Sequence, residues 1–150
     1  MPIIRDTPYL GMNFLVDLGN GVTEGPGAAV MQVLLPEARV DMLEYREGGE
    51  KVTNARKAPA QSRYTPLILR RGYAGSLDWY QWWNQLRNGD MKAQRTVSVQ
   101  LVTEDRSAVV TTWRFTNARA AAWHVANFDA LHPQTLIETL EISVERMTVE

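Results

Sequence analysis

The two histidines are the residues best suited to acid–base or metal chemistry. His124 and His132 are eight positions apart, and Asp129 lies between them. A His-Asp-His group of this kind could bind a metal ion or transfer protons, but nothing in the surrounding sequence fixes its geometry. A histidine that follows a tryptophan, as His124 follows Trp123, more often has a structural role. The histidines therefore do not predict an active site.

The remaining candidate nucleophiles and acids also lack the setting that catalysis requires. Ser98, Ser107 and Ser143 stand outside any G-x-S-x-G segment, which excludes a nucleophile elbow. Glu47 and Glu50 flank two glycines, but a surface turn is the better interpretation, because a general acid needs a pocket around it. The chain has no cysteine and no glycine-rich phosphate-binding motif. We therefore expect no enzyme, no metal and no cofactor.

A cluster of aromatic residues suggests recognition rather than catalysis. Its members, within five consecutive positions, are Trp79, Tyr80, Trp82 and Trp83. They could stack on sugars or on bases of single-stranded nucleic acid, but such platforms normally lie in a basic groove, and this segment carries Asp78 and no lysine. Tryptophan is enriched at interface hot spots, so core packing and protein–protein contact are favoured.

A helix over residues 76–87 is predicted to position the aromatic cluster, because apolar residues recur there at spacings of three and four. Ser76 is expected to cap its N-terminus. Asp78 and Arg87 suit the two ends of the helix dipole, and Gly89 suits the left-handed position beyond the C-terminus. Three tryptophans cannot all face one core, so we expect one aromatic side chain to face a partner or a loop.

The rest of the chain has the patterns of β-strands. Strands are predicted over residues 13–18, 29–35 (buried), 40–45, 64–71, 96–101 and 109–115, and again from residue 140. Residues 96–101 and 109–115 form the best antiparallel pair, with residues 103–107 as the hairpin loop. Residues 117–123 could be strand or irregular, and residues 127–133 are a connection that contains turns.

The periodic pattern stops over residues 46–63, where Val52 is the only large apolar residue. A loop of this length in a compact domain is usually functional or disordered. Its basic residues are Arg46, Lys51, Arg56, Lys57 and Arg63, and its acidic residues are Glu47 and Glu50, so its net charge is 5 − 2 = +3.

The composition indicates one domain over residues 1–150. The formal net charge of −1 predicts no general affinity for nucleic acid or acidic membranes. No segment approaches the roughly 20 apolar residues that a membrane span requires. The first residues lack the apolar run of a signal peptide. We expect synthesis in the cytoplasm and no membrane anchor.

Several motifs, taken in order, are similar to those of a known family. They are Pro8-Tyr9, Asn13-Phe14-Leu15-Val16, Glu44-Tyr45-Arg46-Glu47-Gly48-Gly49, Arg56-Lys57, Leu67-Ile68-Leu69-Arg70-Arg71-Gly72, Asp78-Trp79-Tyr80, Trp113-Arg114-Phe115-Thr116-Asn117-Ala118 and Ile137-Glu138-Thr139-Leu140-Glu141-Ile142. In their order and spacing the chain resembles the tail-tube proteins of contractile phages and of phage-tail-like contractile injection systems. These are relatives of the haemolysin-coregulated tube protein of type VI secretion.

The resemblance implies a mainly β fold, a small antiparallel β-barrel or sandwich with one flanking helix. It implies a structural subunit that forms hexameric rings, which stack into a hollow tube for DNA or protein cargo. The implied partners are further copies of the chain, a contractile sheath protein, baseplate or hub proteins and tube-terminating proteins, all within a phage tail or a phage-tail-like particle. No cofactor is implied.

Two alternatives remain open. One is a baseplate-proximal protein of the same family that initiates the tube. The other, from a different class, is a monomeric ligand-binding β-barrel that uses Trp79, Trp82 and Trp83. Solution behaviour separates them, because a ligand-binding module stays monomeric or dimeric whereas a tube protein forms rings or filaments.

On the tube hypothesis, residues 46–63 and Tyr45 become a contact between subunits or stacked rings, including the turn at Gly48 and Gly49. The C-terminal segment has the opposite charge: Glu138, Glu141, Glu145 and Glu150 against Arg146 give −4 + 1 = −3. We hypothesise that the two segments meet across an interface. Two solvated surfaces of opposite sign are an equally good interpretation, since exposed ion pairs contribute only ~0–1 kcal/mol.

Overall fold

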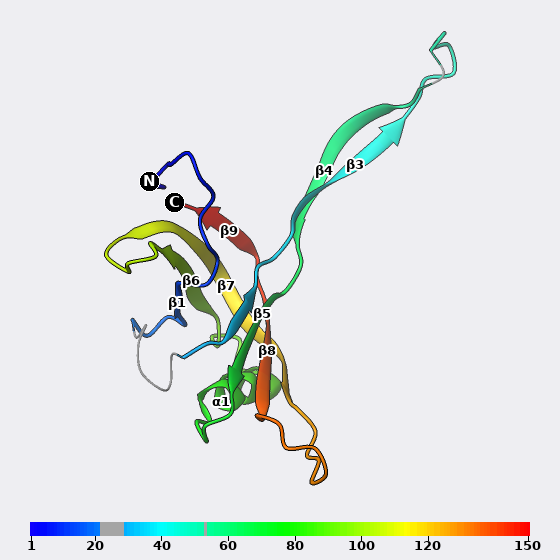
Figure 1. The fold of residues 1–150 in the computed structure, drawn as a ribbon. Coiled ribbons are helices and arrows are strands. Elements are labelled where there is room, and N and C mark those ends of the chain that lie inside the picture. Colours follow the sequence, from blue (N-terminus) through cyan, green and yellow to red (C-terminus); the bar gives the residue numbers. More distant parts are fainter. Residues whose placement is uncertain (22–28, 53) are drawn as a thin grey trace.

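The computed structural model describes residues 1–21, 29–52 and 54–150, and it shows two β-layers, one helix and a projecting hairpin (Figure 1). The elements are β1 (Phe14–Asp17), β2 (Gln32–Leu34), β3 (Ala38–Tyr45), β4 (Arg56–Tyr64), β5 (Leu67–Gly72), α1 (Asp78–Arg87), β6 (Arg95–Val102), β7 (Val109–Val125), β8 (Ile137–Ser143) and β9 (Arg146–Val149). The mainly β fold with one helix is confirmed.

One long strand, β7, joins the two layers. The antiparallel sheet has the order β1-β6-β7-β8-β5-β2, and β9 also pairs with β7. The first half of β7 pairs with β6 and β9, whereas its second half pairs with β8. Asn117 lies between the halves with a φ of 53°, a left-handed conformation that asparagine tolerates better than most residues. The strand therefore bends there and passes from one layer into the other.

The sheet is not closed into a barrel. Of the two expected architectures, barrel and sandwich, the structure is a sandwich. β1 and β2 are the two ends of the strand order and have no pairing with each other. Between the layers, alternate residues of the strands are buried, as a half-buried strand requires. The fully buried side chains include Leu67, Leu69, Val97, Phe115, Leu140 and Ile142.

Helix α1 begins at Asp78, and the prediction that Ser76 caps it is wrong. The residue at the N-cap position is Leu77, with no side-chain hydrogen bond to the helix. The Ser76 hydroxyl instead donates to Asp78 Oδ1 over 2.8 Å. This bond engages the hydroxyl that would have served as the cap. The same Asp78 carboxylate also accepts a hydrogen bond from the Trp79 N–H. The left-handed Gly89, with a φ of +85°, follows the helix as predicted.

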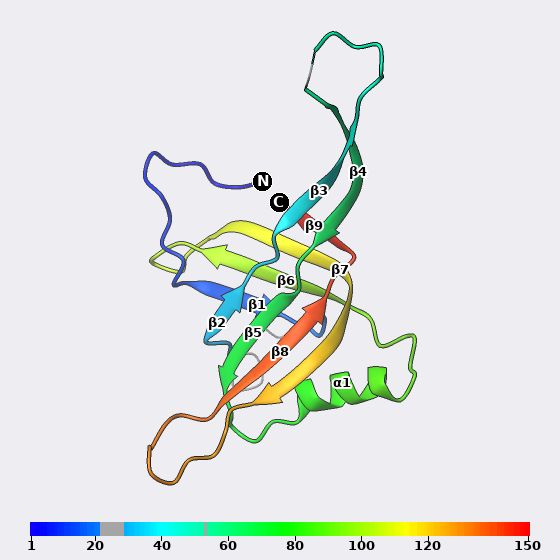
Figure 2. The ribbon, with the colours of Figure 1, turned by 90° about the vertical axis from the view of Figure 1, so that its right-hand side faces the viewer.

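The predicted loop over residues 46–63 is wrong in its second half, because β4 begins at Arg56. β3 and β4 form a separate two-stranded sheet, here called the arm, that projects away from the body (Figures 1 and 2). Neither face of the arm packs on a core, so β4 has no reason to alternate apolar and polar residues. That alternation is the signal by which strands are predicted.

Three smaller differences concern strand limits. Residues 117–123 are strand, within β7. The predicted buried strand over residues 29–35 is only the three-residue edge strand β2, whose residues are exposed or half-buried. The C-terminal segment is strand from Ile137 rather than from residue 140. In the residues that the structure covers, no helix has the length and apolar character to cross a membrane.

Candidate assembly surfaces

The histidine–aspartate group of the sequence is a surface pair rather than a site. His132 Nδ1 lies 2.8 Å from Asp129 Oδ2, and both side chains are largely exposed. Their hydrogen bond lowers the pKa of Asp129. His124 lies elsewhere, on β7 opposite Thr139. Within residues 1–21, 29–52 and 54–150, no group of three or more histidines and carboxylates could hold a metal ion.

The arm exposes apolar side chains on both of its faces. Met42 points to one face, and Leu43 and Tyr45 point to the other, because successive strand residues alternate over this regular part of the ladder. Met42 is 57% exposed and Leu43 is 62% exposed. A two-stranded ribbon cannot bury its own apolar surface, so these residues require a neighbouring chain for burial.

The charged residues of the arm pair mainly with one another. Arg56 Nε lies 2.7 Å from Glu50 Oε1, Arg63 Nε lies 2.6 Å from Asp41 Oδ2, and Lys57 Nζ lies 3.9 Å from Glu44 Oε1. At the tip, the Arg46 guanidinium donates to the carbonyl oxygens of Glu50 and Val52. The turn beside it contains Glu47, Gly48 and Gly49, and Lys51 is exposed. Arg46, Arg56, Lys57 and Arg63 thus make their contacts within the arm itself.

The predicted acidic partner segment is dispersed over the body. Glu138 is buried, so it cannot be part of an acidic surface that contacts another chain. Glu145 accepts a hydrogen bond from Asn117 and pairs with Arg119. The Glu150 carboxylate lies 2.5 Å from Arg114 Nη1. Glu141 lies on the outer face of the sheet, opposite Ile68. β8 and β9 belong to the body, and the arm projects away from them (Figure 1).

Glu138 instead organises a buried polar network beneath helix α1. Its Oε2 lies 2.8 Å from Arg71 Nε, and its Oε1 accepts a hydrogen bond from Trp123 Nε1 over 2.7 Å. Arg71 Nη2 lies 2.6 Å from Asp78 Oδ1, and the guanidinium stacks on the Trp79 ring. Burial raises the pKa of Asp78, but hydrogen bonds from Arg71 and Ser76 outweigh it and lower that pKa. The network ties α1 to β5, β7 and β8.

The aromatic cluster divides into core residues and a surface patch. Trp79 and Trp82 are buried, and Trp82 Nε1 donates to the Ala93 carbonyl oxygen. Tyr80 and Trp83 are only half-buried. The Tyr80 ring centroid lies 5.2 Å from that of Trp123 and 6.2 Å from that of Trp83, and Arg87 lies over Trp83. We call Tyr80, Trp83, Arg87 and Trp123 the aromatic patch.

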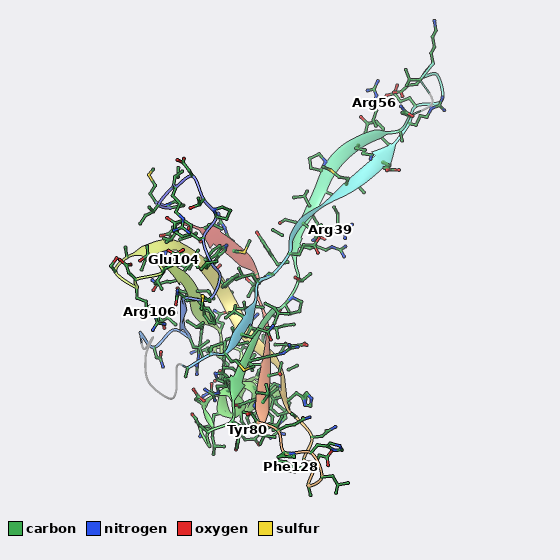
Figure 3. All side chains as sticks on the ribbon, viewed as in Figure 1. Arg39, Arg56, Tyr80, Glu104, Arg106 and Phe128 are labelled. Carbon is green, nitrogen blue, oxygen red and sulfur yellow. The ribbon has the colours of Figure 1, made fainter. Side chains whose placement is uncertain are left out.

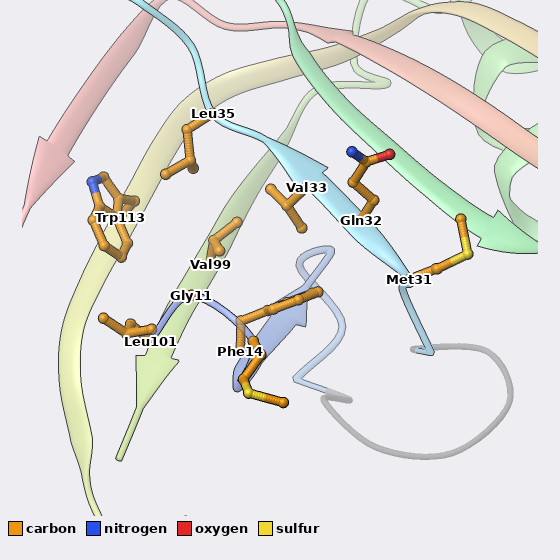
Figure 4. Close-up of a pocket in the computed structure, with 10 residues that line it drawn as sticks. Gly11, Phe14, Met31, Gln32, Val33, Leu35, Val99, Leu101 and Trp113 are labelled. Atoms are coloured by element: carbon orange, nitrogen blue, oxygen red, sulfur yellow. The ribbon is translucent and has the colours of Figure 1, made fainter. Parts of the chain in front are cut away.

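An apolar pocket of about 400 Å³ opens beside β1 and β2, the two ends of the strand order, and no sequence pattern predicts it. We call it the seam pocket. Its lining includes Met12, Phe14, Met31, Val33, Leu101 and Trp113, from β1, β2, β6, β7 and the segments beside them (Figure 4). These segments meet only through the strand order of the sheet, which local sequence patterns do not reveal.

The connection between β7 and β8, residues 126–136, is a further exposed apolar element. Phe128 is 88% exposed and Leu131 is 86% exposed. This pole loop lies at the opposite end of the molecule from the arm, as the labelled Phe128 and Arg56 show (Figure 3). Two large apolar residues in a turn-bearing segment were a signal in the sequence that could have identified it.

Comparison with solved structures shows the same fold in tube assemblies. A chain in "Cryo-EM structure of the anti-feeding prophage (AFP) baseplate, 6-fold symmetrised" is 25% identical with a TM-score of 0.80, and the match covers 97% of both chains. A chain in the PVC sheath-tube complex of an extracellular contractile injection system is 22% identical with a TM-score of 0.82, covering 97% of this chain and 93% of that one.

A more distant match shares the fold at lower sequence identity. Hcp1 from Flavobacterium johnsoniae is 18% identical with a TM-score of 0.53, and the match covers 91% of this chain and 94% of that one. No curated protein sequence matches the chain.

The sequence profile described as T4-like virus tail tube protein gp19 matches residues 10–148, which is nearly the whole chain. The chain therefore belongs to the T4-like tail tube family and is a structural subunit of the tube of a contractile tail or injection system.

Proposed function

We propose that six copies of the chain close into a ring and that such rings stack into a hollow inner tube. Two free strand edges support the lateral contact. β2 ends the strand order on one side, and within the described residues the second half of β7 pairs with β8 alone. These edges differ, so joining them is a head-to-tail contact that a rotation can close into a ring. Strand addition across such edges supplies main-chain hydrogen bonds.

The strand ends support the stacking contact. If strand edges meet around the ring, the two ends of β5 and β8 face the rings above and below. The arm lies at one end and the pole loop at the other (Figure 2). The apolar residues Leu43 and Tyr45 on the arm then meet a neighbouring ring, as do Phe128 and Leu131 on the pole loop. The observation that carries the proposal is this exposed apolar surface at both ends of the subunit.

The role of the tube is mechanical on this proposal, with no catalysis and no cofactor. The proposed partners are a sheath, a baseplate and a tube-terminating cap, as in the similar systems. The proposed cargo is DNA or protein. The charged pairs of the arm hold its shape for stacking, and Tyr45 to Lys51 form its tip. A baseplate-proximal tube initiator is the second candidate, favoured by the 25% identity to a chain of the AFP baseplate.

Negative-stain electron microscopy of the purified chain over a concentration series tests the proposal. Six-fold rings or hollow tubes are the expected result. Leu43→Ser with Tyr45→Ser should shorten or abolish tubes while rings persist. The control is Gln61→Ala, which replaces an exposed polar residue of the same arm and should leave tubes unchanged. A chain that stays monomeric with and without a candidate baseplate partner would overturn the proposal.

A further inference from the structure

We infer that each subunit inserts the aromatic patch of its helix α1 into the seam pocket of the next subunit in the ring. The inference rests on the proposed ring and adds a second, side-chain contact to the joining of strand edges. The occupant of the pocket is a second copy of this chain, because a tube subunit must present both of its flanks to further copies.

The pocket and the patch lie on opposite flanks of the subunit. β2 ends the sheet on one flank, with β5 and β8 between it and the second half of β7. Helix α1 packs against β7 through the ring contact of Tyr80 with Trp123. Figure 2 shows β1 and β2 on one side of the body and α1 on the other. In a head-to-tail ring, one flank of each subunit meets the opposite flank of its neighbour.

The pocket and the patch also lie in the same layer. Val33 lines the pocket and pairs in register with the buried Leu69, so the pocket lies on the core side of β2. Trp123 pairs in register with the buried Leu140, so the patch lies on the core side of β7. When β2 of one subunit continues the sheet from β7 of the next, the layer beneath the sheet must also continue. Helix α1 of one subunit then lies beside the seam pocket of its neighbour, where the two layers of the sandwich are open.

The chemistry of the two surfaces is complementary. Tyrosine, tryptophan and arginine, the residue types of the patch, dominate interface hot spots. At the pocket, Met12 and Met31 are exposed beside the deeper Phe14 and Trp113. Methionine side chains adapt to the shape of a partner, and their sulfur atoms make favourable contacts with aromatic ring edges. In the free subunit Met12 and Met31 are exposed and the aromatic rings of the patch are half-buried, so docking removes the remaining apolar area from solvent on both sides.

Cross-linking tests the contact directly, because the chain has no natural cysteine. Met31→Cys places a thiol at the pocket, and Asn84→Cys places one on α1 between Tyr80 and Arg87. With a short bismaleimide linker, the double variant should give a ladder of linked species ending at the ring, whereas each single variant should give none. Met31→Cys with Ala130→Cys in the pole loop is the matched control and should give no such ladder.

The outcomes separate this inference from the proposed function. Rings without the ladder would overturn the helix docking and leave the ring proposal standing. Linked dimers from a single variant would show a two-fold contact and would also overturn it. A chain that remains monomeric at every concentration would overturn both. As a second readout, Met31→Ser should raise the concentration needed for rings by about threefold to tenfold through loss of buried apolar contact, and Met31→Leu, which keeps an apolar side chain of similar volume, should restore much of it.

Discussion

Arg71 on β5 and Glu138 on β8 form an ion pair inside the protein, 2.8 Å apart, and their side chains are 3% and 1% exposed. They occupy directly paired positions of two antiparallel strands. A charge buried to this extent must be paired and hydrogen-bonded, or the fold loses several kcal/mol. Trp123 and Asp78 complete the pairing, so the network fixes where α1 lies.

Glu138→Ala should lower the free energy of unfolding by about 3–5 kcal/mol, because Arg71 would keep its burial and lose its main partner. Urea unfolding measures the change. Glu138→Gln keeps one carbonyl acceptor, enough for one of the two bonds from Arg71 and Trp123, and is the matched control, with a smaller loss. If Glu138→Gln were as stable as the unchanged protein, the carboxylate charge would have no role in the network.

Asn117 holds a left-handed conformation in the middle of β7, and its side chain donates to Glu145. Asn117→Ala should therefore cost about 1–2 kcal/mol of unfolding free energy, since alanine lacks the short polar side chain that makes the left-handed conformation tolerable for asparagine and also loses the bond to Glu145. Asn117→Gly should cost less, because glycine adopts a positive φ freely even though the hydrogen bond is lost. The urea midpoints of the two variants are compared. A higher midpoint for Asn117→Gly would show that the backbone conformation contributes more to stability than the side-chain hydrogen bond.

Asp105 makes the free energy of unfolding depend on pH in the acid range. Hydrogen bonds from Thr103 and Ser107 lower its pKa from 3.8 to about 2. Because the folded pKa lies below the unfolded one, its contribution is complete above about pH 4 and disappears as the pH falls toward about 2. Asp105→Asn should flatten the melting temperature over that window. Ser107→Ala should raise the pKa of Asp105 toward its ordinary value, which an NMR titration of the carboxyl would detect.

The pole loop should govern tube length. Phe128→Ser with Leu131→Ser removes its two exposed apolar side chains, so rings should form but stack less. Sedimentation and electron microscopy would report rings or short tubes. Gln134→Ser, a polar change in the same loop, is the control and should leave the length distribution unchanged. Full-length tubes from the double serine variant would assign stacking to other surfaces.

Charge reversal at Arg56 and Lys57 is a poor probe of assembly. Both residues pair with carboxylates of the arm itself, so acidic replacements would bring like charges together in the free subunit. Any loss of tubes would then combine a distorted arm with a lost contact. Substitutions of the exposed apolar residues of the arm avoid this ambiguity.

The sequence predicts best where one side of an element faces the core. The alternation in β6 and the first half of β7 located both strands, and the aromatic spacing located α1. β4 was missed because both of its faces are exposed. Glu138 was misassigned to the surface, although it has the same strand parity as the buried Leu140 and Ile142. The seam pocket could not be predicted, since Met12 and Met31 meet only through pairing between distant strands.

β7 belongs to both layers of the sandwich, and on the proposed tube function this bears on how a subunit carries a mechanical load. In a sandwich whose layers touch only through side chains, a shearing load can slide one layer over the other. Here a single backbone runs from the β6 side to the β8 side through Asn117. Such a slide would have to bend or stretch covalent chain. In the proposed tube, a thrust along the axis would pass between the two layers of each subunit through peptide bonds.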